Sequence, residues 1–134
     1  MIQAYFDQLK HIVDSYAAAS FVLDARVSFE LRPGDQGYLL GSMLFLDQSL
    51  LHFREYLDVA EGRVNRLSYS YHYQDSEDRL VFRYDNALHR PALLALEHKH
   101  SGDTIVASPA PSLEVVLSEI AGDKGWIEEM AERK

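Results

Sequence analysis

The sequence contains no cysteine, and this excludes several kinds of site at once. Disulfide bonds, thiolate nucleophiles, cysteine-ligated zinc and iron–sulfur clusters all require that residue. The sequence also lacks an apolar run of the roughly eighteen residues that a membrane span needs. Its first ten residues, MIQAYFDQLK, contain no apolar core and do not resemble a signal peptide. We therefore expect a cytoplasmic protein that does not enter a membrane.

Positive charge and common catalytic motifs are scarce as well. Thirteen lysines and arginines stand against 21 aspartates and glutamates, which gives a formal net charge of −8. This balance disfavours broad electrostatic attachment to nucleic acid or to an anionic membrane. The sequence has no phosphate-binding glycine loop, no GxSxG nucleophile elbow and no dinucleotide fingerprint. Common cofactor enzymes and serine hydrolases are therefore disfavoured, and we expect no cofactor.

The pattern of apolar residues predicts a single domain over residues 1–134. A hydrophobic content of 47% over 134 residues is typical of a globular chain of that size. Apolar residues at three- and four-residue spacing predict a helix over the first twenty residues, and Ser112 is a good N-cap for a last helix. Between the helices, alternating segments predict strands. Their ranges are 21–31, 38–46, 50–59, 67–74 and 80–85, with shorter strands near 93–100 and 104–106.

Short turns between consecutive strands favour antiparallel neighbours. We therefore predict an α+β fold, in which an antiparallel β-meander of about five to seven strands carries an N-terminal and a C-terminal helix on one face.

The hairpin from residue 67 to residue 85 is predicted to have two chemically different faces. If its loop runs from Asp75 to Asp78, aromatic side chains pair across the two strands on one face. The same register places His72, Arg83 and Asp85 on the opposite face, and a slip of one residue would reverse the faces. The predicted pairs are Tyr73 with Leu80, Tyr71 with Phe82, and Tyr69 with Tyr84.

A histidine-rich and locally basic segment follows the hairpin. Three of the six histidines, His89, His98 and His100, fall within twelve residues. The stretch 79–100 holds four basic and two acidic residues, whereas the rest of the chain holds nine basic and nineteen acidic ones. This contrast favours an anion site or a docking patch, with chance composition as the alternative.

Two kinds of chemistry fit these residues. His98 and His100 would point the same way on a strand, and two imidazoles with a carboxylate such as Asp85, Glu97 or Asp103 would bind a metal ion. That spacing is weakly specific, and we assign no metal ligand.

The other chemistry is acid–base catalysis without a metal. One histidine takes a proton while another donates one, as attack of a ribose 2′-hydroxyl on phosphate requires. His98 or His100 would work with His72 or His89, and a cation would stabilise the developing charge. Arg83 and Lys99 are the candidates for that cation.

Structural roles are the alternative for several of these residues. The tyrosines of the hairpin are most simply core aromatics, and Asp85 with Asn86 is compatible with an Asx turn that closes a strand. Glu55 is predicted to point inward, where a buried charge needs a partner such as Arg83.

Three runs carry a resemblance to a known family. They are RYDNALHRP at 83–91, EHKHSGD at 97–103 and FLDQSLLHFREY at 45–56. Their order and spacing resemble the pattern of the TumE family, whose members are toxins of bacterial and archaeal toxin–antitoxin systems. The family pattern has a proline where Leu88 stands and a histidine where Glu97 stands.

The resemblance implies a toxin that cleaves RNA or otherwise blocks translation. It implies a cognate antitoxin as partner, expected to be a small DNA-binding protein that covers the basic segment. The implied substrate class is RNA, and a homodimer is compatible with the sequence. An inactive protein-binding module and a metal-dependent hydrolase are the alternative functions. The candidate catalytic residues are Arg83, Asp85, His89, His98, Lys99 and His100, and the candidate substrate-binding residues are His72, Tyr84, Asn86 and Arg90.

Overall fold

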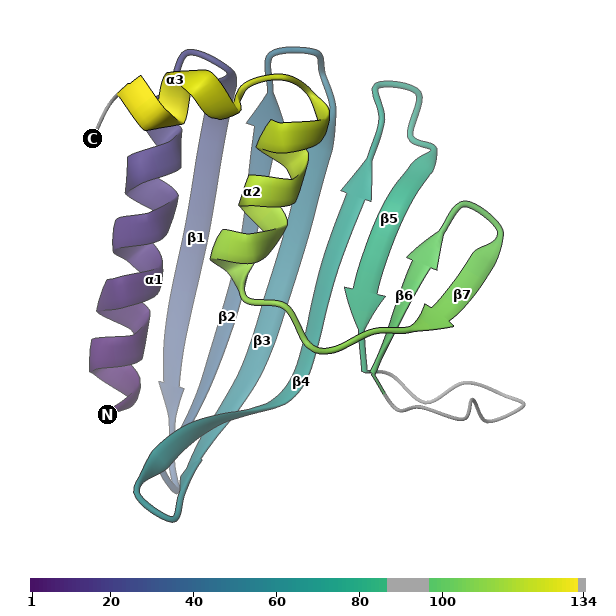
Figure 1. Cartoon of the computed structure of the whole chain (residues 1–134). Coiled ribbons are helices and arrows are strands. Elements are labelled where there is room, and N and C mark those ends of the chain that lie inside the picture. Colours follow the sequence, from purple (N-terminus) through teal and green to yellow (C-terminus); the bar gives the residue numbers. More distant parts are fainter. Residues whose placement is uncertain (87–96, 133–134) are drawn as a thin grey trace.

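The computed structural model describes residues 1–86 and 97–132, and within them seven strands form one antiparallel sheet. The spatial order of the strands is their order in the sequence, so the predicted meander is confirmed (Figure 1). The strands are β1 (Val22–Arg32), β2 (Gln36–Phe45), β3 (Leu50–Ala60), β4 (Arg63–Gln74), β5 (Leu80–Asp85), β6 (His98–Ser101) and β7 (Thr104–Ala107). The helices are α1 (Ile2–Ala17), α2 (Leu113–Asp123) and α3 (Ile127–Glu132).

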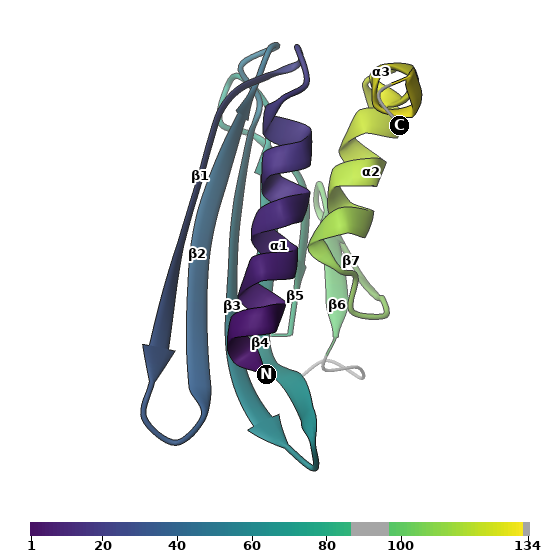
Figure 2. The same ribbon diagram turned by 90° about the vertical axis from the view of Figure 1, so that its left-hand side faces the viewer.

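Helices from both ends of the chain cover the same face of the sheet (Figures 1 and 2). In α1 the buried residues recur at three- and four-residue spacing, which presents one apolar stripe to the sheet. At the start of α2 the Ser112 hydroxyl accepts a hydrogen bond of 3.2 Å from the Val115 amide, so the predicted cap is confirmed. The α+β class with helices on one face is therefore also confirmed. None of the described helices is long and apolar enough to cross a membrane.

Strand alternation gives the sheet two different faces. On the helix-covered face, side chains such as Phe53, Tyr71 and Phe82 are at most 2% exposed and belong to one hydrophobic core. The neighbours of these residues along each strand point the other way. We call this second face, opposite the helices, the open face. His52, His72 and Arg83 lie on it, one from each of three successive strands.

The register of the β4–β5 hairpin differs from the predicted one. Tyr71 pairs with Tyr84 and Tyr73 with Phe82, and the ladder is irregular next to Tyr73, so the pairing is displaced by two residues. The loop is longer than predicted because Asp75 accepts hydrogen bonds from the backbone amides of Glu77 and Arg79. A displacement of two residues keeps every side chain on its face. The predicted grouping of His72, Arg83 and Asp85 on one face is therefore confirmed.

Glu55 points into the core, as predicted, but Arg83 is not its partner. Glu55 lies on the helix-covered side and is 1% exposed, whereas Arg83 lies on the open face. The Glu55 carboxylate accepts hydrogen bonds from the Tyr5 hydroxyl and, at 2.5 Å, from the Tyr71 hydroxyl. Arg66 in turn donates to the Tyr71 oxygen at 2.6 Å. This network joins α1 to the middle of the sheet.

Candidate functional site

Two rows of side chains cross the open face from strand to strand. Residues that pair directly in an antiparallel ladder point to the same face, so a chain of pairs becomes a continuous row. The first row is Arg26, Ser42, His52, His72, Arg83 and His100. The second row is Ser28, Leu40, Arg54, Ser70, Asp85 and His98. The rows bring together histidines and arginines that are far apart in the sequence.

Asp85 is the centre of the charged part of these rows. Its Oδ2 accepts a hydrogen bond from Arg83 Nε at 2.6 Å, and its Oδ1 lies 2.5 Å from His98 Nε2. His100 Nε2 is 3.7 Å from Oδ2. Asp85 is 3% exposed and His98 is 1% exposed, and a carboxylate so buried needs partners of this kind. We call Arg83, Asp85, His98 and His100 the Asp85 cluster.

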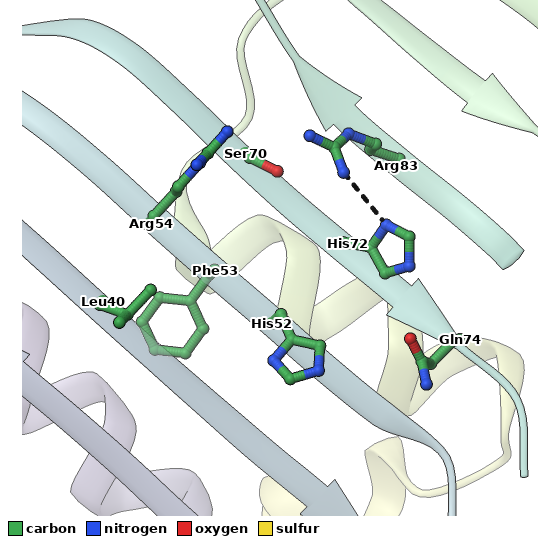
Figure 3. Close-up of a pocket in the computed structure, with 8 residues that line it drawn as sticks. All are labelled: Leu40, His52, Phe53, Arg54, Ser70, His72, Gln74 and Arg83. Atoms are coloured by element: carbon green, nitrogen blue, oxygen red, sulfur yellow. Dashed lines mark hydrogen bonds between the residues drawn. The ribbon is translucent and has the colours of Figure 1, made fainter. Parts of the chain in front are cut away.

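His72 extends the cluster across β4. Arg83 Nη1 lies 3.3 Å from His72 Nδ1 (Figure 3). Because the guanidinium is always protonated, Arg83 donates this hydrogen bond and His72 carries its proton on Nε2. Burial lowers the pKa of His72 below 6.5, and the positive charges of Arg83 and His52 add to the shift. His72 is therefore neutral at neutral pH.

A pocket of about 350 Å³ opens beside the cluster on the open face (Figure 3). Its wall carries the side chains of His52, Arg54, Ser70, His72 and Arg83. Leu40, Phe53 and Gln74 also line it. The residues therefore come from four successive strands, β2 to β5, and we call this the open-face pocket.

The structure gathers four of the candidate catalytic residues and separates a fifth. Arg83, Asp85, His98 and His100 form the cluster, with the candidate binding residue His72 beside them. Lys99 lies between two cluster histidines on the strand, so alternation turns it to the helix-covered side, where its Nζ is 3.0 Å from Glu119 Oε2.

Two candidate binding residues have other partners. The Tyr84 hydroxyl also donates to Glu119, at 2.5 Å, so it lies on the same side of the sheet as Lys99. Asn86 spans two strands, because its Oδ1 accepts from the Tyr69 amide at 3.1 Å and its Nδ2 donates to the Leu67 carbonyl at 3.0 Å. This side chain holds the end of β5 against β4. His89 and Arg90 lie outside the described residues.

Sequence reasoning missed Arg54, Ser70 and His52 as members of the site. The alternation of LLHFREY does place His52 and Arg54 on one side of a strand. The missing information was the pairing of β3 with β4, which puts His52 opposite His72 and Arg54 opposite Ser70. A cross-strand pair involves no local sequence signal, so it becomes visible only in the folded sheet.

Asp85, His98 and His100 also have the spacing of a metal site. One ligand atom from each residue can be chosen so that all three lie within 4.8 Å of one another. Carboxylate and imidazole groups suit zinc and other first-row transition metals. Arg83 also forms an ion pair with the Asp85 carboxylate, however. Its positively charged guanidinium would therefore lie next to any metal ion bound there.

Comparison with known proteins gives one result. A family model described as Toxin TumE matches residues 9–130. This range includes the whole sheet, the described Asp85 cluster and α2. No curated protein and no solved structure gives a significant match.

Proposed function

Because the chain belongs to the TumE toxin family, we propose that it is the toxin of a toxin–antitoxin pair and that it cleaves RNA at the Asp85 cluster without a metal ion. One observation carries this proposal. Arg83 stands between His72 and His100 in a cross-strand row, so a cation has an imidazole on each side. Transesterification of RNA needs these three groups.

The proposed reaction is attack by a ribose 2′-hydroxyl on the adjacent phosphodiester. A bond forms between the 2′-oxygen and phosphorus, and the bond from phosphorus to the 5′-oxygen of the next nucleotide breaks. A base takes the 2′-hydroxyl proton, and an acid gives a proton to the leaving 5′-oxygen. The products are a 2′,3′-cyclic phosphate and a 5′-hydroxyl, and no water is consumed in this step.

The environments of the two histidines favour different roles. His72 has a lowered pKa and is the proposed base; its Nδ1 becomes available when Arg83 turns toward a phosphate. His100 is the proposed acid, because its protonated ring would form an ion pair with Asp85. Arg83 stabilises the charge that develops on the phosphate oxygens, and Asp85 orients both Arg83 and His100. The reaction needs one neutral member and one protonated member in such a pair.

Induced expression in bacteria tests the proposal. We expect the wild-type protein to arrest growth and to fragment RNA, whereas His100→Ala does neither, because the variant lacks the proposed acid. Growth curves and gels of total RNA and tRNA provide the measurement, with expression matched by immunoblot. His11→Ala is the matched control, since His11 lies on the exposed side of α1. A harmless wild type with intact RNA would contradict the proposal and favour a protein-binding module.

The pH dependence of cleavage tests the role of His72. We expect the acid limb of the kcat/KM profile to lie below pH 6.5, because burial and the charge of Arg83 lower the pKa of the base. Arg83→Gln should move this limb toward pH 6.5 in addition to slowing cleavage. Initial rates on a short RNA between about pH 4.5 and 8 measure the effect. If His72→Ala keeps the wild-type acid limb, His72 is not the base.

A metal-dependent hydrolase is the second candidate, and the spacing of Asp85, His98 and His100 favours it. A metal ion would activate water and neutralise charge on the phosphate. Metal analysis of purified protein separates the two candidates. Stoichiometric zinc or manganese that His98→Ala loses would support the metal reading, while cleavage that is insensitive to chelators would support the acid–base reading.

The toxin family also indicates the partner. We propose a cognate antitoxin protein that covers the open face and so blocks access to the Asp85 cluster. Co-expression should restore growth, and the complex should protect His72 and Arg83 from solvent.

A further inference from the structure

The open-face pocket contains more positive charge than the proposed reaction uses. Arg83 stabilises the reacting phosphate in that reaction, but Arg54 also lines the pocket. Arg54 is exposed and takes part in none of the ion pairs among the residues that the structure describes. In the folded sheet it pairs with Ser70 on β4, and Ser70 pairs in turn with Asp85 on β5. The guanidinium of Arg54 on β3 therefore lies two strands away from Asp85 on β5.

The lining of the pocket is selective in charge. Two arginines and two histidines face it, together with the Ser70 hydroxyl and the Gln74 amide. None of the described residues that line it is acidic. On a chain with a net charge of −8, a pocket without a carboxylate attracts an anion where the rest of the surface repels one. Figure 3 shows Arg54 and Arg83 on the same side of the pocket, with the Ser70 side chain between them.

The hollow continues across the sheet toward β1. A second hollow of about 300 Å³ shares Leu40 and His52 with the open-face pocket. It adds Arg26 and Ser28 from β1 and Ser42 from β2. Both rows of the open face therefore line a path that runs across the strands, and Leu40, which is 49% exposed, lines both hollows. Adjacent strands are about 4.8 Å apart, so the path from β5 to β1 is about 19 Å long.

We propose that this path binds the phosphodiester backbone of a single RNA strand and leads it to the Asp85 cluster, with Arg54 and His52 holding a phosphate next to the one that reacts. The inference deepens the proposed ribonuclease function and rests on it for the identity of the strand. Guanidinium groups bind phosphate oxygens through paired hydrogen bonds. The Ser70 hydroxyl is a neutral donor beside them, and Gln74 Nε2, which donates one N–H to Asp78 Oδ1 at 3.0 Å, has a second N–H. Contacts of this kind position a strand without reading its sequence.

The pocket favours backbone contacts over base stacking. The hairpin tyrosines lie on the helix-covered face, and Phe53 in the pocket lining is 1% exposed, so the other rings of that described lining are the imidazoles of His52 and His72. Platforms that stack bases need exposed aromatic rings. We therefore expect binding to depend strongly on salt and weakly on base sequence.

Binding of an uncleavable strand tests the inference independently of catalysis. A fluorescent single-stranded RNA with 2′-O-methyl groups cannot undergo 2′-hydroxyl attack, and anisotropy measures its affinity between about 50 and 200 mM salt. We expect Arg54→Gln to raise Kd about tenfold, since it removes a charged hydrogen-bonding group. It should also reduce the slope of log K against log salt by about 0.7, the value for one phosphate contact on a single strand.

Arg63→Gln is the matched control, because it removes the same charge from an exposed residue at the β3–β4 turn. The control should keep the wild-type Kd and salt slope. Equal effects of the two variants would show that binding depends on overall charge and not on this path, which would overturn the inference. Failure of the wild type to bind the strand would overturn it as well.

The same measurements separate the path from the ribonuclease proposal. If the wild type binds and Arg54→Gln shows the expected loss, but unmodified RNA stays intact, the path stands and the ribonuclease proposal fails. If unmodified RNA is cleaved but Arg54→Gln binds like the wild type, the ribonuclease proposal stands and the path fails.

Discussion

Replacing Asp85 by asparagine should lower the rate of RNA cleavage by about 10³-fold. The carboxylate contacts Arg83 Nε at 2.6 Å and His98 Nε2 at 2.5 Å, and it lies 3.7 Å from His100 Nε2. Asparagine has nearly the same size but no charge. The variant therefore loses the ion pair that orients Arg83 and the one that would stabilise protonated His100. Single-turnover cleavage of a short RNA at saturating enzyme measures the loss.

A positioning role of Asp85 has to be separated from a structural one. Because the side chain is buried, Asp85→Asn is also expected to lower Tm, so rates are compared well below the transition of the variant. Separate measurement of kcat and KM gives a further readout: loss of the orientation of Arg83 and His100 should lower kcat more than it raises KM.

Asp103→Asn is the matched control for Asp85→Asn, since Asp103 is exposed in the β6–β7 turn. Its kcat and KM should match those of the wild type. A folded Asp85→Asn protein that cleaves RNA at the wild-type rate would refute the assignment of the site.

The largest effect on stability is expected from Glu55→Ala. The carboxylate of Glu55 is 1% exposed and accepts hydrogen bonds from the Tyr5 and Tyr71 hydroxyls. Removing the carboxylate leaves the Tyr5 and Tyr71 hydroxyls without their acceptor. It also removes the negative charge that interacts with Arg66 in this network. Breaking such a buried network costs about 3 to 5 kcal/mol of the free energy of unfolding. Urea denaturation measures this loss, and Tm should fall by about 10 °C or more.

A conservative variant and a surface variant sharpen this test. Glu55→Gln keeps one acceptor oxygen, so its loss should be smaller, on the order of 1 to 2 kcal/mol. Glu77→Ala removes a carboxylate whose side chain is 70% exposed, and its effect should stay within about 0.5 kcal/mol. If Glu55→Ala is as stable as Glu77→Ala, the network contributes nothing to folding.

The pH dependence of stability follows from the same residue. Burial raises the pKa of Glu55 above 4.5, although the hydroxyls of Tyr5 and Tyr71 oppose the shift. The folded protein therefore binds this proton more tightly than the unfolded chain does. The contribution of the group to stability is complete below pH 4.5 and is lost as the pH rises through the raised pKa. This part of the pH dependence should disappear in Glu55→Gln.

Local sequence patterns determined the fold class and the chemistry of each face. Alternation along β4 and β5 put the tyrosines on one side and His72, Arg83 and Asp85 on the other. This division holds in the structure although the observed register differs from the predicted one by two residues. The reason is that side chains alternate with a period of two, so only an odd slip exchanges the faces. The predicted helices were equally local, since their apolar stripes and the Ser112 cap need no distant partner.

The register and the partners across strands were not available from the sequence. The Asp75 loop and the irregular ladder beside Tyr73 decided which residues pair in the hairpin. Lys99 was grouped with its histidine neighbours by sequence proximity, but the strand turned it to Glu119 on the other side. Glu55 found tyrosine partners because helix α1 and strand β4 approach it from segments 50 and 16 residues away.

The sequence by itself therefore determined the family, the α+β meander and the residue types at the site, because motifs and alternation are local properties of the chain. Only the tertiary structure decided that His52 and Arg54 of β3 join His72, Arg83 and Asp85 on one open face. Cross-strand rows depend on which strands become neighbours and in which register, and that choice is made by packing the whole sheet against its helices. The candidate site is a property of those rows.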